Sequence, residues 1–399
     1  MDSDLLPVGR RVAYWRGRRK LSQQVFADRL GKSKSWVDKV ERGVRSLDKV
    51  STLQDIAAVL RIDTAILLGQ DAQPADVSQR AEGVERIRMA LSAYEIALGR
   101  QAARRPVLPA DRLAGKVGHA WITYQHARYP QLIDLLPPLL ADAQRTHAHD
   151  PGAGRVLLVE ACRVAAALLL KLGEDDLAWL AVDRAMAAAT GHPLLVATTA
   201  VQLGQVLRAS GRASAAKSAT LTAAYRIAPP DPDEGPPPVL SLCGTLLVQA
   251  AMSAARYGDD QAAADLIDEA AGMAVRVGEG RDHHRTGFGP TVVDLARVTA
   301  ALDLGDAHAA IVWHEQTATG DGWRWLSAEH RAAHLIEAAR AYLHADDPTN
   351  AGLTLIDADR TAPAEIRHRP AARQVLAQVA RDRRAPVTVI ELAITLGIT

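Results

Sequence analysis

Cysteine, aromatic residues and long apolar runs are all scarce in this 399-residue sequence. Its longest apolar run, Val164 to Leu170, is far too short to cross a membrane, and the start MDSDLLPVGR lacks the basic and apolar regions of a secretory signal. We therefore expect a cytoplasmic protein without membrane contact. Cys162 and Cys243 lie within apolar helical patterns, which indicates small buried side chains in a reducing compartment rather than a disulfide.

Aromatic residues make up only 4% of the chain, whereas alanine and leucine dominate its 48% of apolar residues, and this composition favours helices over sheets. The length favours two or more packing units. Residues 1–70 contain 14 Lys/Arg against 8 Asp/Glu, and the other 329 residues contain 33 against 38. The net charge is therefore +6 in residues 1–70 and −5 in the other residues, which indicates nucleic-acid contact confined to the N-terminus.

The segment LSQQVFADRLGKSKSWVDKVERGVRS, residues 21–46, predicts two short helices joined by a tight turn. Ser22 is placed to cap the first helix, and Gly31 ends it because glycine adopts positive φ without strain. Ser33 is placed to cap the second helix, whose apolar side recurs at three- and four-residue spacing and whose outer side is polar and cationic. Apolar periodicity predicts one helix upstream of this segment and another over residues 50–60.

Small and polar residues at fixed offsets in this segment resemble the helix-turn-helix domain of the phage-repressor and xenobiotic-response-element type, over about residues 9–69. The residues that carry the resemblance are Ser22, Gln23, Ala27, Gly31, Ser33, Val37, Glu41 and Gly43. The resemblance implies that Gln23 touches the DNA backbone, that the early outward residues of the second helix read base edges, and that Arg16 pairs with Glu41 as a structural ion pair. The predicted DNA-binding set is Gln23, Ser33, Lys34, Ser35, Asp38, Lys39 and Arg42.

Chemistry agrees with this role, because lysine donates to guanine and a serine hydroxyl serves either a base edge or a phosphate. Asp38 is an exception on this positively charged surface. It either accepts a hydrogen bond from cytosine N4 or repels phosphate and so helps to fix the position of the helix on the DNA. The basic run RGRRK, Arg16–Lys20, is either a solvated charge run or a source of phosphate contacts.

A polar segment containing proline and glycine, residues 70–83, predicts a linker between a domain of residues 1–69 and a second domain of residues 84–399. In the second domain, residues 332–365 and 203–229 match the 34-residue tetratricopeptide spacing. Weaker copies and a hairpin over residues 110–147 bring the expectation to six or seven helical hairpins. PPDPDEGPPP, residues 229–238, predicts either a rigid surface connector or a polyproline site for a partner.

The combined arrangement resembles the helix-turn-helix regulators with tetratricopeptide-like C-terminal domains that are abundant in actinobacteria. We therefore expect an all-α protein, with an N-terminal helix-turn-helix domain followed by a tetratricopeptide-like superhelix. The resemblance implies a transcriptional regulator, and we expect it to bind double-stranded DNA at a palindromic operator as a homodimer. The terminal segment PVTVIELAITLGIT carries more apolar residues than one stripe can hide and is expected to dock on a neighbouring element or a second subunit. The alternative is a helical-repeat adaptor with a weak DNA-binding head.

Catalytic signatures are missing: the sequence contains no phosphate-binding glycine loop, nucleophile elbow or cysteine cluster. His330 and His334 have the i, i+4 spacing of two metal ligands but lack a third, and His283-His284 reads as a solvated loop. We expect neither an enzyme nor a cofactor or metal. The tryptophans of DGWRW, residues 321–325, are either core anchors or a stacking wall.

Effector binding is expected on the concave wall that the first helices of successive hairpins form. The chain has a single asparagine, Asn350, which argues against the asparagine clamp of peptide-responsive regulators and favours a small-molecule or protein effector. The candidate contacts, each of which is otherwise an ordinary surface residue, are Tyr124, Gln125, Arg128, Gln202, Gln205 and Gln249.

Overall fold

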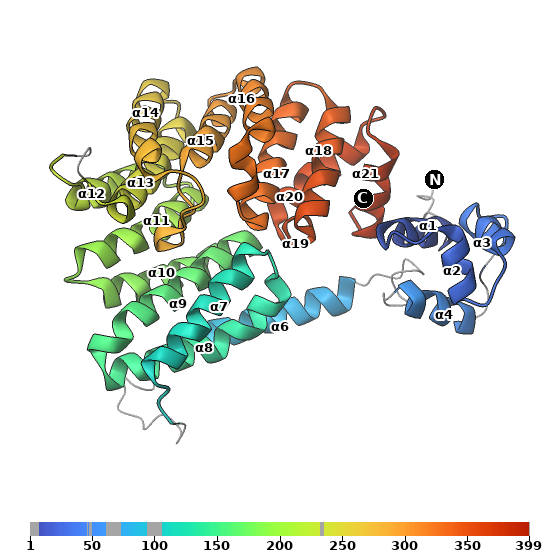
Figure 1. Ribbon diagram of the computed structural model, residues 1–399, viewed down its shortest axis with the longest axis horizontal. Coiled ribbons are helices and arrows are strands. Elements are labelled where there is room, and N and C mark those ends of the chain that lie inside the picture. Colours follow the sequence, from blue (N-terminus) through green and yellow to red (C-terminus); the bar gives the residue numbers. More distant parts are fainter. Residues whose placement is uncertain are drawn as a thin grey trace. The chain divides into compact units, whose positions relative to one another are not determined.

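The computed structural model describes residues 8–45, 47, 50–60, 73–93, 106–231 and 235–398, and every regular element within these ranges is helical (Figure 1). Contacts divide the chain into two units: the first contains residues up to Glu82 together with Leu376–Thr399, and the second contains Gly83–Val375. The all-α fold expected from composition is confirmed. One described helix, Pro237–Arg256, is long and apolar enough to cross a membrane, but 83% of its apolar window is buried, as in the core helix of a globular protein.

The first unit begins with four helices around a small apolar core: α1 (Val8–Arg18), α2 (Gln23–Arg29), α3 (Lys34–Glu41) and α4 (Val50–Leu60). The buried residues recur at the spacing that the sequence predicts, and they are Val12, Trp15, Phe26, Ala27, Val37, Val40, Ile56, Ala57 and Leu60. A glycine lets α1 approach α3 closely, because a Cβ at Gly9 would lie 1.7 Å from the carbonyl oxygen of Val40.

The C-terminal helix α21 (Val387–Thr395) belongs to the same unit and contacts α1. It buries Val389 and Leu392, whereas Val387 stays exposed. Contacts within the unit therefore cover part of its apolar surface, in agreement with the first of the two alternatives that the sequence leaves open. α20 (Pro370–Arg381) precedes it.

Most of the predicted linker, residues 70–83, is helical, which its composition does not indicate. α6 (Gln73–Leu91) runs through residues 73–83, while residues 70–72 lie outside the described residues. Pro74 stands at the second helical position, where its missing N–H breaks no helical hydrogen bond, and the residues after it include good helix formers such as alanine, glutamine and arginine. The boundary that the contacts give falls inside this helix, between Glu82 and Gly83.

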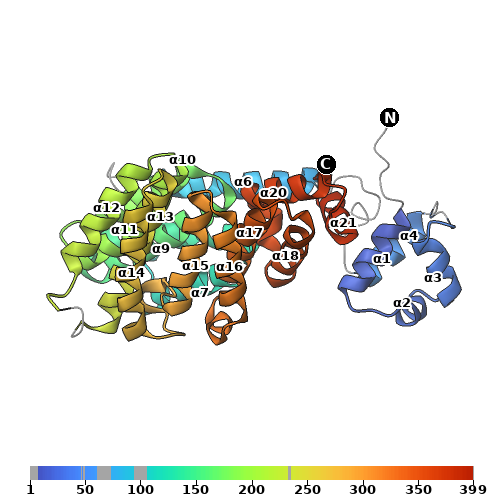
Figure 2. The same cartoon turned by 90° about the horizontal axis from the view of Figure 1, so that it is seen from above.

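The second unit stacks six helical hairpins over residues 110–361, and Figure 2 shows several of their helices side by side. The hairpins are α7 (Ala110–Gln125) with α8 (Tyr129–His149), α9 (Pro151–Leu172) with α10 (Asp175–Ala189), α11 (Pro193–Ala209) with α12 (Ala213–Ile227), α13 (Pro237–Arg256) with α14 (Asp260–Val277), α15 (Pro290–Asp303) with α16 (Ala307–Thr319), and α17 (Ala328–His344) with α18 (Pro348–Thr361). Two short 3-10 helices, η2 (His283–Arg285) and η3 (Asp321–Trp325), lie between hairpins, and α19 (Pro363–His368) follows the last one.

Both tetratricopeptide-like matches are confirmed as helical hairpins. Ala338 and Ala351 are fully buried where α17 meets α18. In α11, a Cβ at Gly204 would lie 2.5 Å from Cγ2 of Thr220 on α12, so the small residue sets the distance between the two helices. The hairpin expected over residues 110–147 is also confirmed, as α7 and α8.

The proline-rich segment is only partly a connector. Pro237 and Pro238 form the first turn of α13, where their fixed φ suits a helix start, so these two residues belong to a helix and not to the connector. Residues 232–234 lie outside the described residues. Cys162 and Cys243 are free and buried, as expected.

The hairpins curve, so that the last elements return to the first. α17 contacts α7, and α19 contacts α9, and Figure 1 shows these elements close together although the sequence separates them widely. Along the inner side, the first helices of successive hairpins contact one another in the order α9, α11, α13, α15 and α17. This inner side is where the second unit has its cavities.

Candidate nucleic-acid interface and effector cavity

Helices α2 and α3 are positioned by two capping serines and a glycine turn. Ser22 Oγ accepts a hydrogen bond from the Val25 backbone nitrogen at 3.2 Å, and Ser33 Oγ accepts one from the Trp36 nitrogen at 3.1 Å. Gly31 has a φ of 63° between the two helices. Both caps and the turn agree with the sequence prediction, and Ser33 therefore has a structural role at the start of α3.

The outer face of α3 presents three predicted contact residues to solvent. Lys34, Ser35 and Lys39 are exposed, and the described structure gives none of their side chains a hydrogen bond or an ion pair. Two ammonium groups and a hydroxyl on one face of a short helix are free to bind the acceptors of base edges or phosphates.

Asp38 and Arg42, the other predicted contacts on α3, pair with each other. Arg42 Nη2 donates to Asp38 Oδ2 at 2.5 Å, one helical turn apart, and both side chains are exposed. Exposed pairs of this kind contribute about 0–1 kcal/mol. A base or phosphate contact by either residue therefore replaces this ion pair at small cost.

A buried carboxylate joins α1, α2 and α3. Arg16 donates to Glu41 through Nε at 2.6 Å and Nη2 at 3.0 Å, which confirms the ion pair that the resemblance implies. Gln23 Nε2 donates to the same carboxylate at 2.8 Å. The sequence did not reveal this bond. Because an amide nitrogen carries two hydrogens, one remains for a phosphate oxygen, so the predicted backbone contact of Gln23 stays a prediction.

The basic run Arg16–Lys20 is partly structural, and this extends beyond the Arg16–Glu41 pair that the resemblance implies. Arg16 Nη1 also donates to the carbonyl of Leu21 at 2.7 Å, and Arg19 Nε donates to the carbonyl of Leu60 at 2.9 Å. These bonds connect the end of α1 to the following turn and to the end of α4.

Two adjoining cavities of about 420 and 460 Å³ lie on the inner side of the second unit. Their volumes fall within the range of small-molecule sites. Six residues line both of them: Trp121, Tyr124, Arg285, Thr286, Glu329 and His330. Of the predicted effector contacts, Gln125 lines the first cavity, Gln202, Gln205 and Gln249 line the second, and Tyr124 lines both.

Arg128 is the exception, because the expectation that it lies on a first helix is wrong. α7 ends at Gln125 because the chain turns sharply at Ala127, which has a φ of 51°. Arg128 then precedes α8 as an exposed residue and lines neither cavity.

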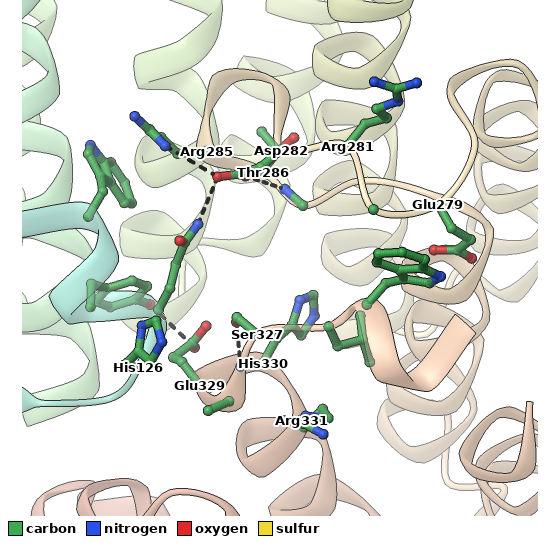
Figure 3. Close-up of a pocket in the computed structure, with 18 residues that line it drawn as sticks. His126, Glu279, Arg281, Asp282, Arg285, Thr286, Ser327, Glu329, His330 and Arg331 are labelled. Atoms are coloured by element: carbon green, nitrogen blue, oxygen red, sulfur yellow. Dashed lines mark hydrogen bonds and ion pairs between the residues drawn. The ribbon is translucent and has the colours of Figure 1, made fainter. Parts of the chain in front are cut away.

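A loop before α15 forms one rim of the first cavity. Figure 3 shows the Asp282 carboxylate of this loop as the point where several hydrogen bonds and ion pairs meet. Gln125 Nε2 donates to Asp282 at 2.9 Å, and the guanidinium of Arg285 lies 3.5 Å from the same carboxylate. His284 and Arg285 both adopt positive φ, of 52° and 61°, which is a strained conformation for residues with side chains. Arg163 holds this loop by donating to the carbonyl of His284 at 3.0 Å.

On the opposite rim, a buried ion network joins the first and last elements of the unit. Lys171 of α9 contacts Glu329 of α17 and lies 3.0 Å from Glu365 of α19, a residue with 0% exposure. Tyr124 donates to Glu329 at 3.4 Å, as Figure 3 shows, and Tyr129 donates to Glu365. The network closes the curved stack of hairpins.

Charges within the network offset the effect of burial. Burial alone would raise the pKa of Glu329, but Lys171 and His330 outweigh it and hold this pKa below the usual value. Burial would lower the pKa of Lys171, but Glu329 and Glu365 raise it overall. Both groups are therefore charged at neutral pH, and each depends on the other.

The two histidines with metal-like spacing have different surroundings. His334 shares a 2.9 Å hydrogen bond with His314 Nδ1, whereas His330 faces the ion network. Burial, together with His314 and His330, lowers the pKa of His334 to about 3. Within the described ranges, no group of three His, Cys, Asp or Glu side chains could hold a metal ion.

The two tryptophans of DGWRW have different surroundings, and neither is fully buried. Trp323 packs edge-on against His334, with ring centroids 5.7 Å apart. Trp325 is 56% exposed and lines the first cavity, where a Cβ at Gly280 would lie 2.9 Å from its ring.

Comparison with known protein families gives a match in the N-terminal part of the chain. Residues 7–66 match a family model described as a helix-turn-helix domain. The chain carries a helix-turn-helix domain. No curated protein matches the sequence.

Two solved structures are similar to the chain at low scores. BtubC (BKLC) from P. vanneervenii is 19% identical over 62% of this chain and 90% of its own, with a TM-score of 0.36. PlcR from Bacillus thuringiensis, solved in complex with the peptide PapR7 and DNA, is 13% identical over 68% of this chain and 95% of its own, with a TM-score of 0.28. Likenesses at these scores establish neither a function nor a partner for this chain.

Proposed function

We propose that the protein is a sequence-specific DNA-binding transcriptional regulator of the cytoplasm and that α3 reads the DNA. The observation that carries the proposal is the exposed and unpaired set of Lys34, Ser35 and Lys39 on the second helix of the helix-turn-helix domain. The positive charge of residues 1–70 supports it, because lysine and arginine side chains that neutralise phosphates release counterions and supply affinity.

The regulator acts as a homodimer on a palindromic operator. One helix-turn-helix domain buries little surface on DNA, so useful affinity needs two domains on half-sites about one helical turn apart, or a multiple of that distance. The helical-repeat unit supplies the dimer contact. We expect light scattering to give a dimer at micromolar concentration without DNA, and a monomer there would contradict this part of the proposal.

The cavities of the helical-repeat unit receive an effector. Five of the six candidate contacts line them, and they lie on the first helices α7, α11 and α13. Asn350, the single asparagine, instead bonds to Asp347 at the start of α18 and lines neither cavity. A clamp of asparagine amides is therefore missing from the cavity walls, which favours a small molecule over an extended peptide.

Selection from a pool of random DNA duplexes with the full-length chain tests the proposal. We expect the wild type to enrich a motif with two-fold symmetry, and a variant with both Lys34→Ala and Lys39→Ala to lose that enrichment. Lys116→Ala is the matched control, because Lys116 is a half-exposed lysine of the second unit that pairs with Asp142. Failure of the wild type to enrich any motif would favour the adaptor function instead.

A further inference from the structure

One end of the larger cavity holds an arginine without an acidic partner. Arg208, in the last turn of α11, donates to the Gln249 carbonyl at 3.1 Å and to Gln249 Oε1 at 2.7 Å. No carboxylate of the described residues forms an ion pair with it. Burial lowers the pKa of Arg208 to about 10, so its guanidinium is still charged at neutral pH. The charge of Asp303 acts on Arg208 from beyond ion-pair distance, but this carboxylate already pairs with Arg256. A ligand that supplies an anion would therefore still offset the cost of burying the Arg208 guanidinium.

Two glutamine amides that line the same cavity add further donors. Gln202 Oε1 accepts from Arg163 Nε at 2.9 Å, and Gln249 Oε1 accepts from Arg208, so both amide oxygens are engaged. The orientation of each amide follows from its arginine donor, and the described structure gives neither amide nitrogen an acceptor. Both side chains line the cavity while being only 5% and 8% exposed.

A fourth donor group lies in the wall that the two cavities share. Trp121 is 2% exposed, and its buried indole nitrogen has no hydrogen-bond partner. Indole offers only a donor, and a buried donor without an acceptor costs about 1–3 kcal/mol. The guanidinium of Arg163 lies over the Trp121 ring at 5.4 Å, which adds positive charge to the same wall.

The acidic side chains of the larger cavity are already neutralised. Glu329 contacts Lys171, Glu337 contacts both Arg340 and Arg369, and Asp303 lies 3.4 Å from Arg256. The carboxylates of this wall are therefore all paired, whereas the amide nitrogens of Gln202 and Gln249 are free to donate. Apolar side chains also line this cavity: Leu170, Val201, Val248, Met252, Val292 and Leu295.

We propose that this cavity binds a small organic anion, whose carboxylate or phosphate group accepts hydrogen bonds from Arg208 and from the amides of Gln202 and Gln249. The apolar body of the anion packs against the apolar wall. This inference rests on the proposed effector function of the second unit and names the chemical class of the effector. Carboxylates and phosphates share the acceptor geometry that a guanidinium recognises, so the test includes both.

Isothermal titration of the full-length protein with three matched probes tests the proposal. The probes are 2-naphthoate, 2-naphthyl phosphate and the uncharged 2-naphthamide, which share one aromatic body that the cavity volume accommodates. We expect at least one of the two anions to bind about tenfold or more tightly than the amide, a difference of about 1.4 kcal/mol. Equal binding of all three probes, or no binding of either anion at about 5 mM, would overturn the proposal.

Variants then assign the site. Arg208→Gln should reduce the ratio of the association constants of the anion and of 2-naphthamide to about one. Arg208→Lys should restore part of this preference because the charge is kept. Arg226→Gln, which removes an exposed arginine of α12, should leave the ratio unchanged. An anion preference that survives in a folded Arg208→Gln protein would place the anion elsewhere and refute the site.

Operator binding by the same proteins without any probe separates the two proposals. Loss of anion binding with intact DNA binding leaves the regulator function standing and removes only the anion. Anion binding without DNA binding would leave the anion site standing and remove the regulator function.

Discussion

Acid should destabilise the helical-repeat unit below about pH 6.5, chiefly through the buried histidines between α16 and α17. His334 is 5% exposed, and its Nε2 shares a hydrogen bond with His314 Nδ1. Folding lowers its pKa from 6.5 to about 3 because burial and the neighbouring His314 disfavour the charged ring. The unfolded chain therefore binds a proton at pH values where the folded chain does not.

The sign and size of the effect follow from this difference. The stabilisation is fully present above pH 6.5 and is lost progressively as the pH falls towards about 3. Each pH unit in that window corresponds to about 1.4 kcal/mol per histidine, so His334 alone accounts for a loss of about 2 kcal/mol at about pH 5. The pKa values of His314 and His330 are lowered as well, mainly by burial, and act in the same direction.

Urea unfolding from about pH 7 to about pH 5, followed by circular dichroism, measures the slope of the unfolding free energy against pH. His334→Gln should make the slope shallower by about 1.4 kcal/mol per pH unit, whereas His308→Gln at an exposed position of α16 should not change it. A slope that is the same in His334→Gln and the wild type would refute the account of this buried pair.

Two further substitutions test the packing and the ion network. Gly9→Ala should unfold or misassemble the helix-turn-helix domain, since its Cβ would lie 1.7 Å from the Val40 carbonyl oxygen, whereas Gly17→Ala, with open space around it, should stabilise α1 by about 0.5–1 kcal/mol. Thermal melts that show the two alanine variants to be equal would contradict the close helix crossing. Lys171→Met leaves Glu365 buried with only a more distant cation, and it should lower the unfolding free energy by about 3 kcal/mol. An unchanged urea midpoint would mean that the network does not close the stack.

Local signals made the helix-turn-helix domain predictable. Capping serines, a glycine with positive φ and apolar spacing act within a few residues, so Ser22, Gly31 and Ser33 define α2 and α3 directly. The bond from Gln23 to Glu41 joins residues 18 positions apart, and only the folded arrangement of α2 and α3 reveals it. The same limit explains Arg128, whose helical assignment failed at the unforeseen turn of Ala127.

Repeat spacing predicted the hairpins and most of the cavity wall, because the first helices of successive hairpins share one side of the stack. It could not predict the closure of the stack. Tyr129 and Glu365 are 236 residues apart, and nothing in either segment signals the other. The helix in residues 73–83 was missed for a different reason. The polar composition of this segment shows no apolar periodicity, and its proline is compatible with a helix because it stands at the start of α6.

The affinity of the lysine variants for an operator selected by the wild type tests the central claim most directly. Fluorescence anisotropy at fixed salt should show Lys34→Ala and Lys39→Ala each weakening operator binding by about 1–3 kcal/mol, which is about 5- to 150-fold in Kd, while Lys116→Ala stays close to the wild type. Operator binding by both α3 variants as tight as that of the wild type would contradict the claim that this helix reads DNA.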